Sequence, residues 1–258
     1  MNHVVIHIGY PKTGTTSLQR QFFPLLPQRS KFEYVGKFVT HDDQAIHGGF
    51  QKHHGRLLQY LTKQTLSMRE VATWIGAMEN LAGPNILYSE ESLIWHAINN
   101  TIWPYDDAFN PRDTDVLSPV LGLLSVVSAL TDRLSVVLTL RHQKTFLPSI
   151  YSEMQHRLRH PTQSDFEAKT IEIIYSESRM IDYSFLVQQL TSIVGRKNLL
   201  ILFFEDGLEF NAKQIGRYLG IPWSLDKEPF ERDNAKRYQS KGWQGDTRLL
   251  PITKTGFL

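Results

Sequence analysis

The segment between residues 8 and 18 gathers two glycines, a lysine and several hydroxyl side chains. It reads Ile8-Gly9-Tyr10-Pro11-Lys12-Thr13-Gly14-Thr15-Thr16-Ser17-Leu18. Glycine lets a backbone approach an anion closely, and the backbone N–H groups that open a helix attract phosphate or sulfate. Lys12 adds a point charge inside the loop. The pattern therefore predicts an anion-binding loop between a buried strand and a helix.

This loop differs from the Walker A loop of proteins that bind nucleoside triphosphates. Gly9 and Gly14 have the G-x-x-x-x-G spacing, but Thr15 stands where that motif has its lysine. A simple strand–turn–helix corner with a solvated lysine is the structural alternative. A P-loop nucleotide kinase or NTPase is the functional alternative, and the substituted lysine disfavours it.

A second candidate phosphate site follows an apolar run in the middle of the chain. The run Leu134–Leu140 leads into Arg141, and Ser149 comes eight positions later. A guanidinium offers a bidentate fork to a phosphate, and a serine hydroxyl near a helix start adds a neutral donor. We expect Thr145 to cap that helix. An ordinary surface ion pair would also explain Arg141 alone.

Strands and helices alternate along the chain and would position these residues. Strands are predicted from short apolar runs with little polar alternation, which is typical of parallel strands buried on both faces. Helices are predicted from apolar periodicity, and Gly195 is placed to end the last of them. The alternation predicts an α/β fold, with a parallel sheet flanked by helices on both faces. The predicted strands are Val4–Ile8, Asn85–Ser89, Leu134–Leu140 and Asn198–Phe204, and the predicted helices are Thr16–Leu26, Val116–Leu130, Thr145–Leu158 and Asp182–Val194.

The composition is that of an ordinary globular protein. The chain has 258 residues, 41% of them hydrophobic and 21% charged, and its formal net charge is +2. These values exclude collagen-like and wholly disordered chains, and the near-neutral charge argues against a nucleic-acid partner. With no internal repeat and no clear linker, we predict a single domain over residues 1–258. Two segments, Thr40–Arg56 and Asn99–Asp115, have the polar and glycine- or proline-containing composition of long loops.

The chain contains no cysteine. A disulfide scaffold, a thiol nucleophile and cysteine-ligated metals are therefore excluded. The N-terminal apolar run is too short for a signal peptide and lacks a basic flank. The longest uncharged stretch, at residues 116–131, falls short of the ~20 apolar residues that a bilayer span requires. We expect a cytoplasmic protein without a membrane span.

The two candidate phosphate sites together resemble those of sulfotransferases that use 3′-phosphoadenosine 5′-phosphosulfate (PAPS). The string P-K-T-G-T-T-S-L at residues 11–18 resembles the family's loop for the 5′-phosphosulfate. The arginine and the serine eight positions later resemble its 3′-phosphate motif. The run at residues 140–151 is similar to bacterial polysaccharide-type members, although Gln143 stands where animal members have proline. The resemblance assigns Lys12, Thr13, Gly14, Thr15 and Thr16 to the phosphosulfate, and Arg141 and Ser149 to the 3′-phosphate.

Two further segments resemble the same family. The stretch from residue 182 to Glu205 and Asp206 resembles its helix–strand segment that ends in Glu-Asp. The loop at residues 240–246 resembles the one that closes over the 3′-phosphate, in which Lys241 and Gly242 would contact that group. A solvated tail is an equal alternative for this last loop.

Sulfuryl transfer needs a base near the acceptor, and the strand that ends at Ser89 offers two carboxylates. Glu90 and Glu91 follow it directly, and neighbours in an extended chain point to opposite faces. A Ser-x-Glu-Ser string in glycan-type and bacterial members aligns best with Glu91, so Glu91 is the first choice and Glu90 the second. A histidine base is the rival. The four candidate histidines lack the helical spacing of a metal-binding motif, so a metal site is disfavoured. These histidines are His41, His47, His53 and His54.

The resemblance implies a P-loop-like fold and transfer of a sulfuryl group from PAPS to a hydroxyl or an amine. The acceptor would be a small molecule or a glycan, and a carbohydrate is the first choice. PAP (3′,5′-adenosine bisphosphate) would be the nucleotide product, and no metal would be required. A non-catalytic nucleotide-binding protein with this fold is a further alternative. The sequence leaves the oligomeric state open.

Overall fold

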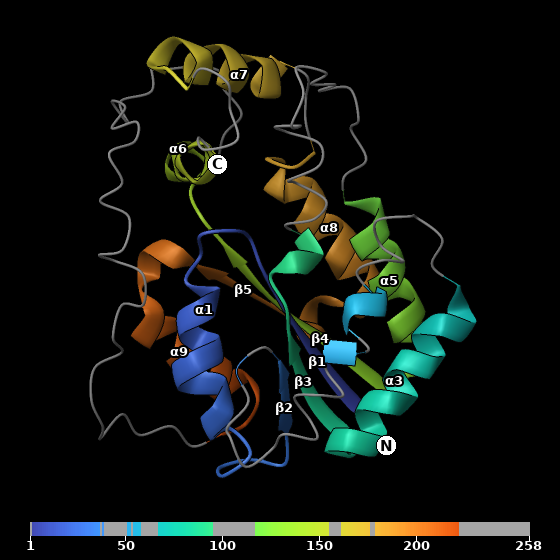
Figure 1. The fold of residues 1–258 in the computed structure, drawn as a ribbon. Coiled ribbons are helices and arrows are strands. Elements are labelled where there is room, and N and C mark those ends of the chain that lie inside the picture. Colours follow the sequence, from blue (N-terminus) through green and yellow to red (C-terminus); the bar gives the residue numbers. More distant parts are fainter. Residues whose placement is uncertain are drawn as a thin grey trace.

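A computed structural model describes residues 2–36, 38, 51–52, 54–57, 67–94, 117–154, 161–175 and 179–221. Five parallel strands form one sheet in the order β2-β3-β1-β4-β5, as Figure 1 shows. The predicted α/β fold with a parallel sheet is confirmed. The strands are β1 (His3–Gly9), β2 (Glu33–Gly36), β3 (Asn85–Ser89), β4 (Arg133–Leu140) and β5 (Leu199–Phe203).

Four of these strands match the predicted ones closely. β3 has the predicted bounds, β1 exceeds its prediction by one residue at each end, and β4 begins one residue earlier than predicted. β5 ends before Phe204, because that residue opens the short 3-10 helix η6 (Phe204–Asp206). β2 was not predicted, because its four residues at the sheet edge are too few to show a pattern.

Side chains alternate between the two faces of the sheet, and each face has its own hydrophobic core. Helices α3 (Met68–Ala82), α5 (Ser118–Leu130) and α8 (Tyr183–Val194) cover one face. The run from α1 (Thr15–Ser17) and helix α9 (Leu208–Tyr218) cover the other, as Figure 1 shows. On β1, for example, Val4 and Ile6 join the first core and Val5 joins the second. Helices on both faces were predicted.

The helix predicted over Thr16–Leu26 is a broken run and not one regular helix. α1 passes into the π-helical segment η1 (Leu18–Phe22) and then into the 3-10 helix η2 (Phe23–Leu25). The physical reason lies in Pro24, which has no N–H to donate to a preceding turn. The run still follows the phosphate loop directly, so the loop keeps the predicted strand–loop–helix context.

The other predicted helices are present. α5 begins at Ser118, two residues later than predicted, and α6 (Gln143–Met154) begins two residues earlier than predicted. Thr145 is therefore inside the first turn of α6 and is not its cap. α8 has Asp182 as its N-cap, and its end is followed by Gly195 with φ 75°. Residues 155–158 of the third predicted helix lie outside the described residues.

Helices α3, α7 (Gln163–Tyr175) and α9 were not predicted. The start of α3 carries a capping box between Ser67 and Glu70, and this local signal was overlooked. The predicted loop at Thr40–Arg56 is wrong in part, because residues 51–52 and 54–56 are helical. The loop predicted at Asn99–Asp115 lies outside the described residues. No helix in the described ranges is long and apolar enough to cross a membrane.

Candidate active site

The phosphate loop begins at the carboxyl end of β1, in the middle of the sheet. The Tyr10 N–H donates to the Thr139 carbonyl of β4 at 3.0 Å, which fixes the first residue of the loop. Lys12 has φ 65° and Gly14 has φ 74°. A lysine rarely adopts the left-handed region, and such backbone strain is concentrated at functional sites. The loop therefore holds Lys12 in a conformation that local preference alone would not select.

The two glycines of the loop are required by close packing. A Cβ on Gly9 would collide with the side-chain hydroxyl of Thr15, and a Cβ on Gly14 would lie 2.8 Å from Cδ2 of Leu208. Gly14 also immediately precedes α1 in its left-handed conformation. Both positions thus exclude larger residues, and the space that they keep clear lets the loop turn tightly.

The loop presents backbone donors and uses its threonine hydroxyls internally. None of the N–H groups of residues 13–16 donates to a backbone carbonyl within the described part of the chain. The buried Thr13 hydroxyl donates to the Tyr10 carbonyl at 2.6 Å and lies 3.2 Å from the Thr15 hydroxyl. An array of N–H groups at the start of a helical run is suited to an anion.

Arg141 follows β4 and reaches across to the phosphate loop. Its Nη1 donates to the Lys12 carbonyl at 2.9 Å and to the Ser149 hydroxyl at 3.1 Å. Its Nε donates to the Thr145 hydroxyl at 3.2 Å. The guanidinium also lies over the Phe204 ring, 4.9 Å from the ring centre. The structure therefore brings the Arg141 guanidinium into contact with both Ser149 and the backbone of Lys12.

Acidic and phenolic groups surround this arginine. The Tyr183 hydroxyl donates to the Arg141 carbonyl at 2.7 Å. Glu205 accepts from the His142 N–H at 3.1 Å, and its carboxylate lies 3.1 Å from the Thr145 hydroxyl. Burial lowers the pKa of the Arg141 guanidinium, whereas Glu205 and Tyr183 raise it. Arg141 stays charged, because arginine loses its proton only far above neutral pH.

Lys12 forms an ion pair that the sequence did not predict. Its Nζ lies 3.0 Å from Oε2 of Glu153, near the end of α6. Both side chains are about one-third exposed. The contact joins the phosphate loop to the helix that carries Ser149, and a bound anion would compete with Glu153 for the lysine.

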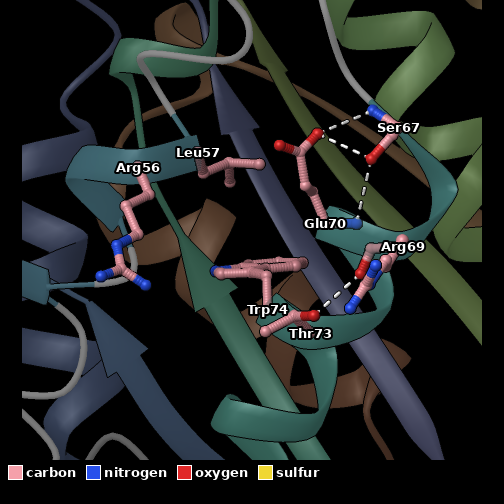
Figure 2. Close-up of a pocket in the computed structure, with 7 residues that line it drawn as sticks. All are labelled: Arg56, Leu57, Ser67, Arg69, Glu70, Thr73 and Trp74. Carbon is pink, nitrogen blue, oxygen red and sulfur yellow. Dashed lines mark hydrogen bonds between the residues drawn. The ribbon is translucent and has the colours of Figure 1, made fainter.

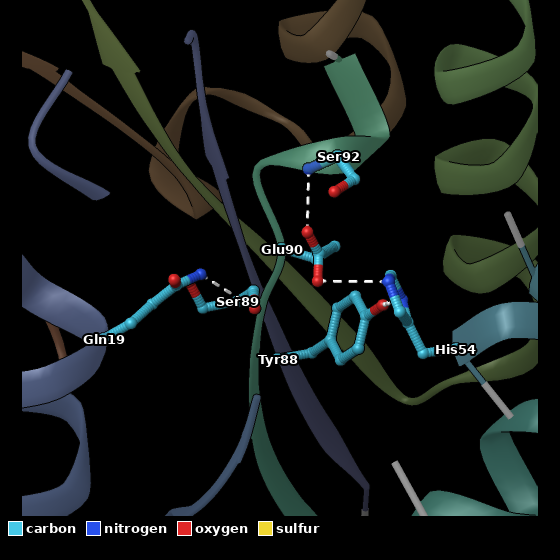
Figure 3. Close-up of polar contacts among 6 residues, drawn as sticks. All are labelled: Gln19, His54, Tyr88, Ser89, Glu90 and Ser92. Carbon is cyan, nitrogen blue, oxygen red and sulfur yellow. Dashed lines mark hydrogen bonds and ion pairs between the residues drawn. The ribbon is translucent and has the colours of Figure 1, made fainter. Parts of the chain in front are cut away.

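A second polar cluster lies at the end of β3 (Figure 3). Glu90 is fully buried, and its Oε2 lies 3.2 Å from Nε2 of His54. Its Oε1 accepts from the Ser92 N–H at 2.8 Å. The other ring nitrogen of His54 lies 2.8 Å from the Tyr88 hydroxyl. Glu91, in contrast, is half-buried.

This cluster bears on the predicted base. Glu90 and His54, both named from sequence as possible bases, form a pair. Since β3 adjoins β1 in the sheet, the pair and the phosphate loop both lie at the carboxyl edge of neighbouring strands. Ligands of open parallel sheets bind at that edge.

A buried polar ladder crosses the sheet just before the phosphate loop. His7 of β1 places Nδ1 2.8 Å from the Ser89 hydroxyl and Nε2 3.1 Å from the Thr139 hydroxyl. Gln19 donates to both the carbonyl and the hydroxyl of Ser89. Burial lowers the pKa of His7 to about 3, so the ring is neutral at neutral pH. Sequence reasoning missed this ladder, whose signal is a histidine inside an otherwise apolar strand.

Several predicted site residues lie outside the described residues. They include the candidate 3′-phosphate loop and three of the four histidines proposed as alternative bases. These residues are Lys241, Gly242, His41, His47 and His53. Among the residues that the structure does describe, no group of three His, Asp or Glu side chains stands where it could hold a metal ion.

No protein-family model and no curated protein matches this chain. Among solved structures, it is similar to the crystal structure of a sulfotransferase from Alicyclobacillus acidocaldarius. The TM-score is 0.48 at 14% identity, over 87% of this chain and 86% of that one. It is also similar to a sulfotransferase domain from the curacin biosynthetic pathway. That TM-score is 0.43 at 12% identity, over 87% of this chain and 76% of the other.

Proposed function

We propose that the protein is a PAPS-dependent sulfotransferase. The observation that carries the proposal is the meeting of two sequence motifs 129 residues apart. A single guanidinium nitrogen of Arg141 contacts both the Lys12 carbonyl and the Ser149 hydroxyl. A nucleotide with phosphates at both the 5′ and the 3′ positions requires two anion sites held at a fixed separation. The contact provides such a fixed link, because it joins one site to the other directly.

In this proposal the phosphate loop binds the 5′-phosphosulfate through Lys12 and residues 13–16. Arg141 and Ser149 bind the 3′-phosphate, and Lys241 and Gly242 are further predicted contacts to that group. The residues present suit such a ligand, because the loop offers backbone donors while its glycines exclude side chains from the turn. PAPS supplies the activated sulfuryl group.

We propose Glu90, paired with His54, as the group that removes the proton from the acceptor. Glu90 follows β3 at the carboxyl edge of the sheet, and the Ser92 N–H and His54 hold its carboxylate in place. An acceptor has to come within hydrogen-bond reach of that carboxylate for Glu90 to act as the base. His54 would orient the carboxylate and share the proton. These contacts lead us to rank Glu90 ahead of Glu91, the first choice from sequence. Glu91 then becomes the alternative that substitution tests.

The proposed reaction balances as a single displacement. The acceptor oxygen or nitrogen forms a bond to sulfur as the bond between sulfur and the 5′-phosphate oxygen breaks. The acceptor proton goes to the Glu90–His54 pair, and PAP leaves with the electron pair of the broken bond. Lys12 and the loop N–H groups stabilise the charge that develops on the leaving phosphate. The protein groups supply this stabilisation, so we propose that no metal is required.

Thermal unfolding with candidate nucleotides tests the proposal. PAP, AMP and ATP with Mg²⁺ are compared at about 1 mM each. A ligand at 100 times its Kd adds about 2.7 kcal/mol of stability. For a protein of this size, 1 kcal/mol shifts the Tm by roughly 2–4 °C. We expect a clear rise in Tm with PAP and a smaller one with AMP.

The outcome also separates the alternatives. A rise in Tm with ATP and Mg²⁺, and no rise with PAP, would reject the sulfotransferase proposal and favour a P-loop kinase. A rise with PAP combined with no transfer of sulfate from PAPS to any of a panel of saccharides, phenols and amines would favour a non-catalytic nucleotide-binding protein.

A further inference from the structure

The guanidinium of Arg141 keeps one nitrogen for a ligand. Its Nε donates to the Thr145 hydroxyl, and its Nη1 donates to the Lys12 carbonyl and the Ser149 hydroxyl. Nη2 carries the two remaining N–H groups and donates to no residue in the described part of the chain. The Ser149 hydroxyl accepts from Arg141, so its own proton is left for another partner. These donors are close together and suit a phosphate group.

Other arginines at a hollow of the surface are not fixed in this way. Arg56 and Arg69 line a pocket of about 360 Å³ at the start of α3 (Figure 2). Both are exposed, and neither guanidinium donates a hydrogen bond within the described residues. A side chain that is already held in one orientation loses less conformational freedom when it binds a ligand. The groups that hold Arg141 should therefore contribute to binding, even though they do not contact the ligand.

The first of these groups is the hydroxyl of Thr145, in the first turn of α6. The Nε of an arginine can only donate, so the hydroxyl accepts from Arg141 over their 3.2 Å contact. The hydroxyl proton is then donated to the His142 carbonyl at 3.0 Å or to Oε1 of Glu205 at 3.1 Å. The Thr145 hydroxyl is thus held by its own acceptors, and it fixes the guanidinium through Nε.

The second group is the hydroxyl of Tyr183, the first residue of α8. β4 ends at Leu140, so the hydrogen bonds of the sheet do not fix the backbone of Arg141. The Tyr183 hydroxyl donates to the Arg141 carbonyl at 2.7 Å, and burial raises the pKa of this tyrosine, so the hydroxyl keeps its proton at neutral pH. The ring packs edge-to-face against Tyr10 of the phosphate loop, with ring centres 5.1 Å apart. Tyr183 therefore holds the main chain from which the guanidinium extends.

We propose that Tyr183 and Thr145 are positioning residues for recognition of the 3′-phosphate. Tyr183 fixes the main chain of Arg141 and Thr145 fixes its side chain, which leaves Nη2 and the Ser149 hydroxyl to bind the phosphate. Each residue acts through Arg141, so its hydroxyl should matter only for ligands that carry a 3′-phosphate. This inference rests on the proposed function for the identity of the ligand.

Titration of the full chain with PAP and with AMP tests the inference, because the two nucleotides differ only in the 3′-phosphate. Tyr183→Phe removes the hydroxyl and keeps the ring against Tyr10, and Thr145→Val removes the hydroxyl and keeps the branched shape. Each variant should weaken PAP binding about three- to ten-fold, as expected for one lost hydrogen bond, and AMP binding by less than about two-fold. A general structural defect would weaken both nucleotides alike, so the ratio of their Kd values separates positioning from stability.

Two further variants are matched controls. Thr145→Ser restores a hydroxyl at the same position and should bind PAP as tightly as the wild type. Tyr218→Phe removes a hydroxyl that also donates to a backbone carbonyl, that of Lys197, at 3.5 Å. Lys197 belongs to the 3-10 helix η5 (Arg196–Asn198), which precedes β5 at the opposite edge of the sheet from Arg141. Tyr218→Phe should therefore leave the ratio of the two Kd values unchanged.

The results separate this inference from the proposed function. Unchanged PAP affinity in both Tyr183→Phe and Thr145→Val, or equal losses for PAP and AMP, would overturn the inference. A selective loss in one of these variants alone keeps the role for that residue and rejects it for the other, and a Thr145→Ser variant as weak as Thr145→Val rejects the role of the Thr145 hydroxyl. If Arg141→Ala loses PAP selectively while neither test variant does, the sulfotransferase proposal stands without the positioning residues. If the wild-type chain binds no PAP, the proposed function fails and this inference fails with it.

Discussion

Arg141 donates a hydrogen bond from Nη1 to the backbone carbonyl of Lys12 at 2.9 Å. This contact connects the end of β4 to a loop that begins at the end of β1, the strand beside it in the sheet. The same nitrogen reaches the Ser149 hydroxyl at 3.1 Å. An arginine placed this way would have two roles in the proposed function, since it would bind the 3′-phosphate together with Ser149 and it fixes the backbone of the phosphate loop at Lys12.

Arg141→Ala should selectively weaken ligands that carry a 3′-phosphate. Charge-assisted hydrogen bonds contribute about 1.5–3 kcal/mol each, so PAP affinity should fall about 10- to 150-fold. AMP lacks that phosphate and should lose much less. Titration of both nucleotides measures the difference, and Arg196→Ala serves as a surface control. If PAP and AMP lose affinity equally, Arg141 does not read the 3′-phosphate.

Lys12→Ala should abolish sulfuryl transfer while the chain stays folded, because the lysine is one-third exposed and contributes charge more than packing. Full activity in this variant would refute the assignment of the phosphate loop.

Glu153→Gln should strengthen the binding of PAP. It removes the carboxylate that competes with the anion for Lys12, so PAP should bind several-fold more tightly. The Tm should change little, since a partly exposed ion pair contributes about 0–1 kcal/mol.

Glu90→Gln should retain PAP binding and lose turnover by about 10²- to 10⁴-fold, the usual contribution of a general base. Glu91→Gln is the matched control from the next position in the chain, and it should keep most of the activity. Transfer of sulfate from labelled PAPS measures the rates, and titration with PAP measures binding. The reverse result would identify Glu91 as the base, as the sequence first indicated.

Stability should decline in mild acid because of His7. Burial lowers the pKa of His7 to about 3, whereas the unfolded chain has the ordinary value of 6.5. Below pH 6.5 the unfolded state therefore binds a proton that the folded state does not. The free energy of unfolding should then fall by about 1.4 kcal/mol per pH unit for this group, down to about pH 3.

His7→Gln checks that assignment, because it removes the titrating ring and keeps an amide that can hydrogen-bond. Urea unfolding of both proteins at pH 7, 6, 5 and 4 gives the two slopes, and the slope of the variant should be smaller. Some slope should remain in the variant, since the pKa of His3 is also lowered, to about 4, with burial as the main cause. Identical slopes would show that His7 does not govern the acid response.

Local patterns in the sequence were sufficient to predict the main strands and the two phosphate motifs. Four of the five strands follow from apolar runs, because residues buried on both faces of a parallel sheet are apolar over a continuous stretch. The loop around Lys12 and the spacing from Arg141 to Ser149 are also short-range features. A buried strand, a glycine turn and a helix start within a few residues determine how such a loop folds.

Only the tertiary structure decided which distant residues meet. The pairing of Glu90 with His54 and the ion pair of Lys12 with Glu153 depend on how helices pack against the sheet. No sequence spacing encodes such contacts, because the residues come from separate elements. The sequence alone therefore predicted which residues would bind anions, whereas the proposed choice of base depends on packing between elements far apart in the chain.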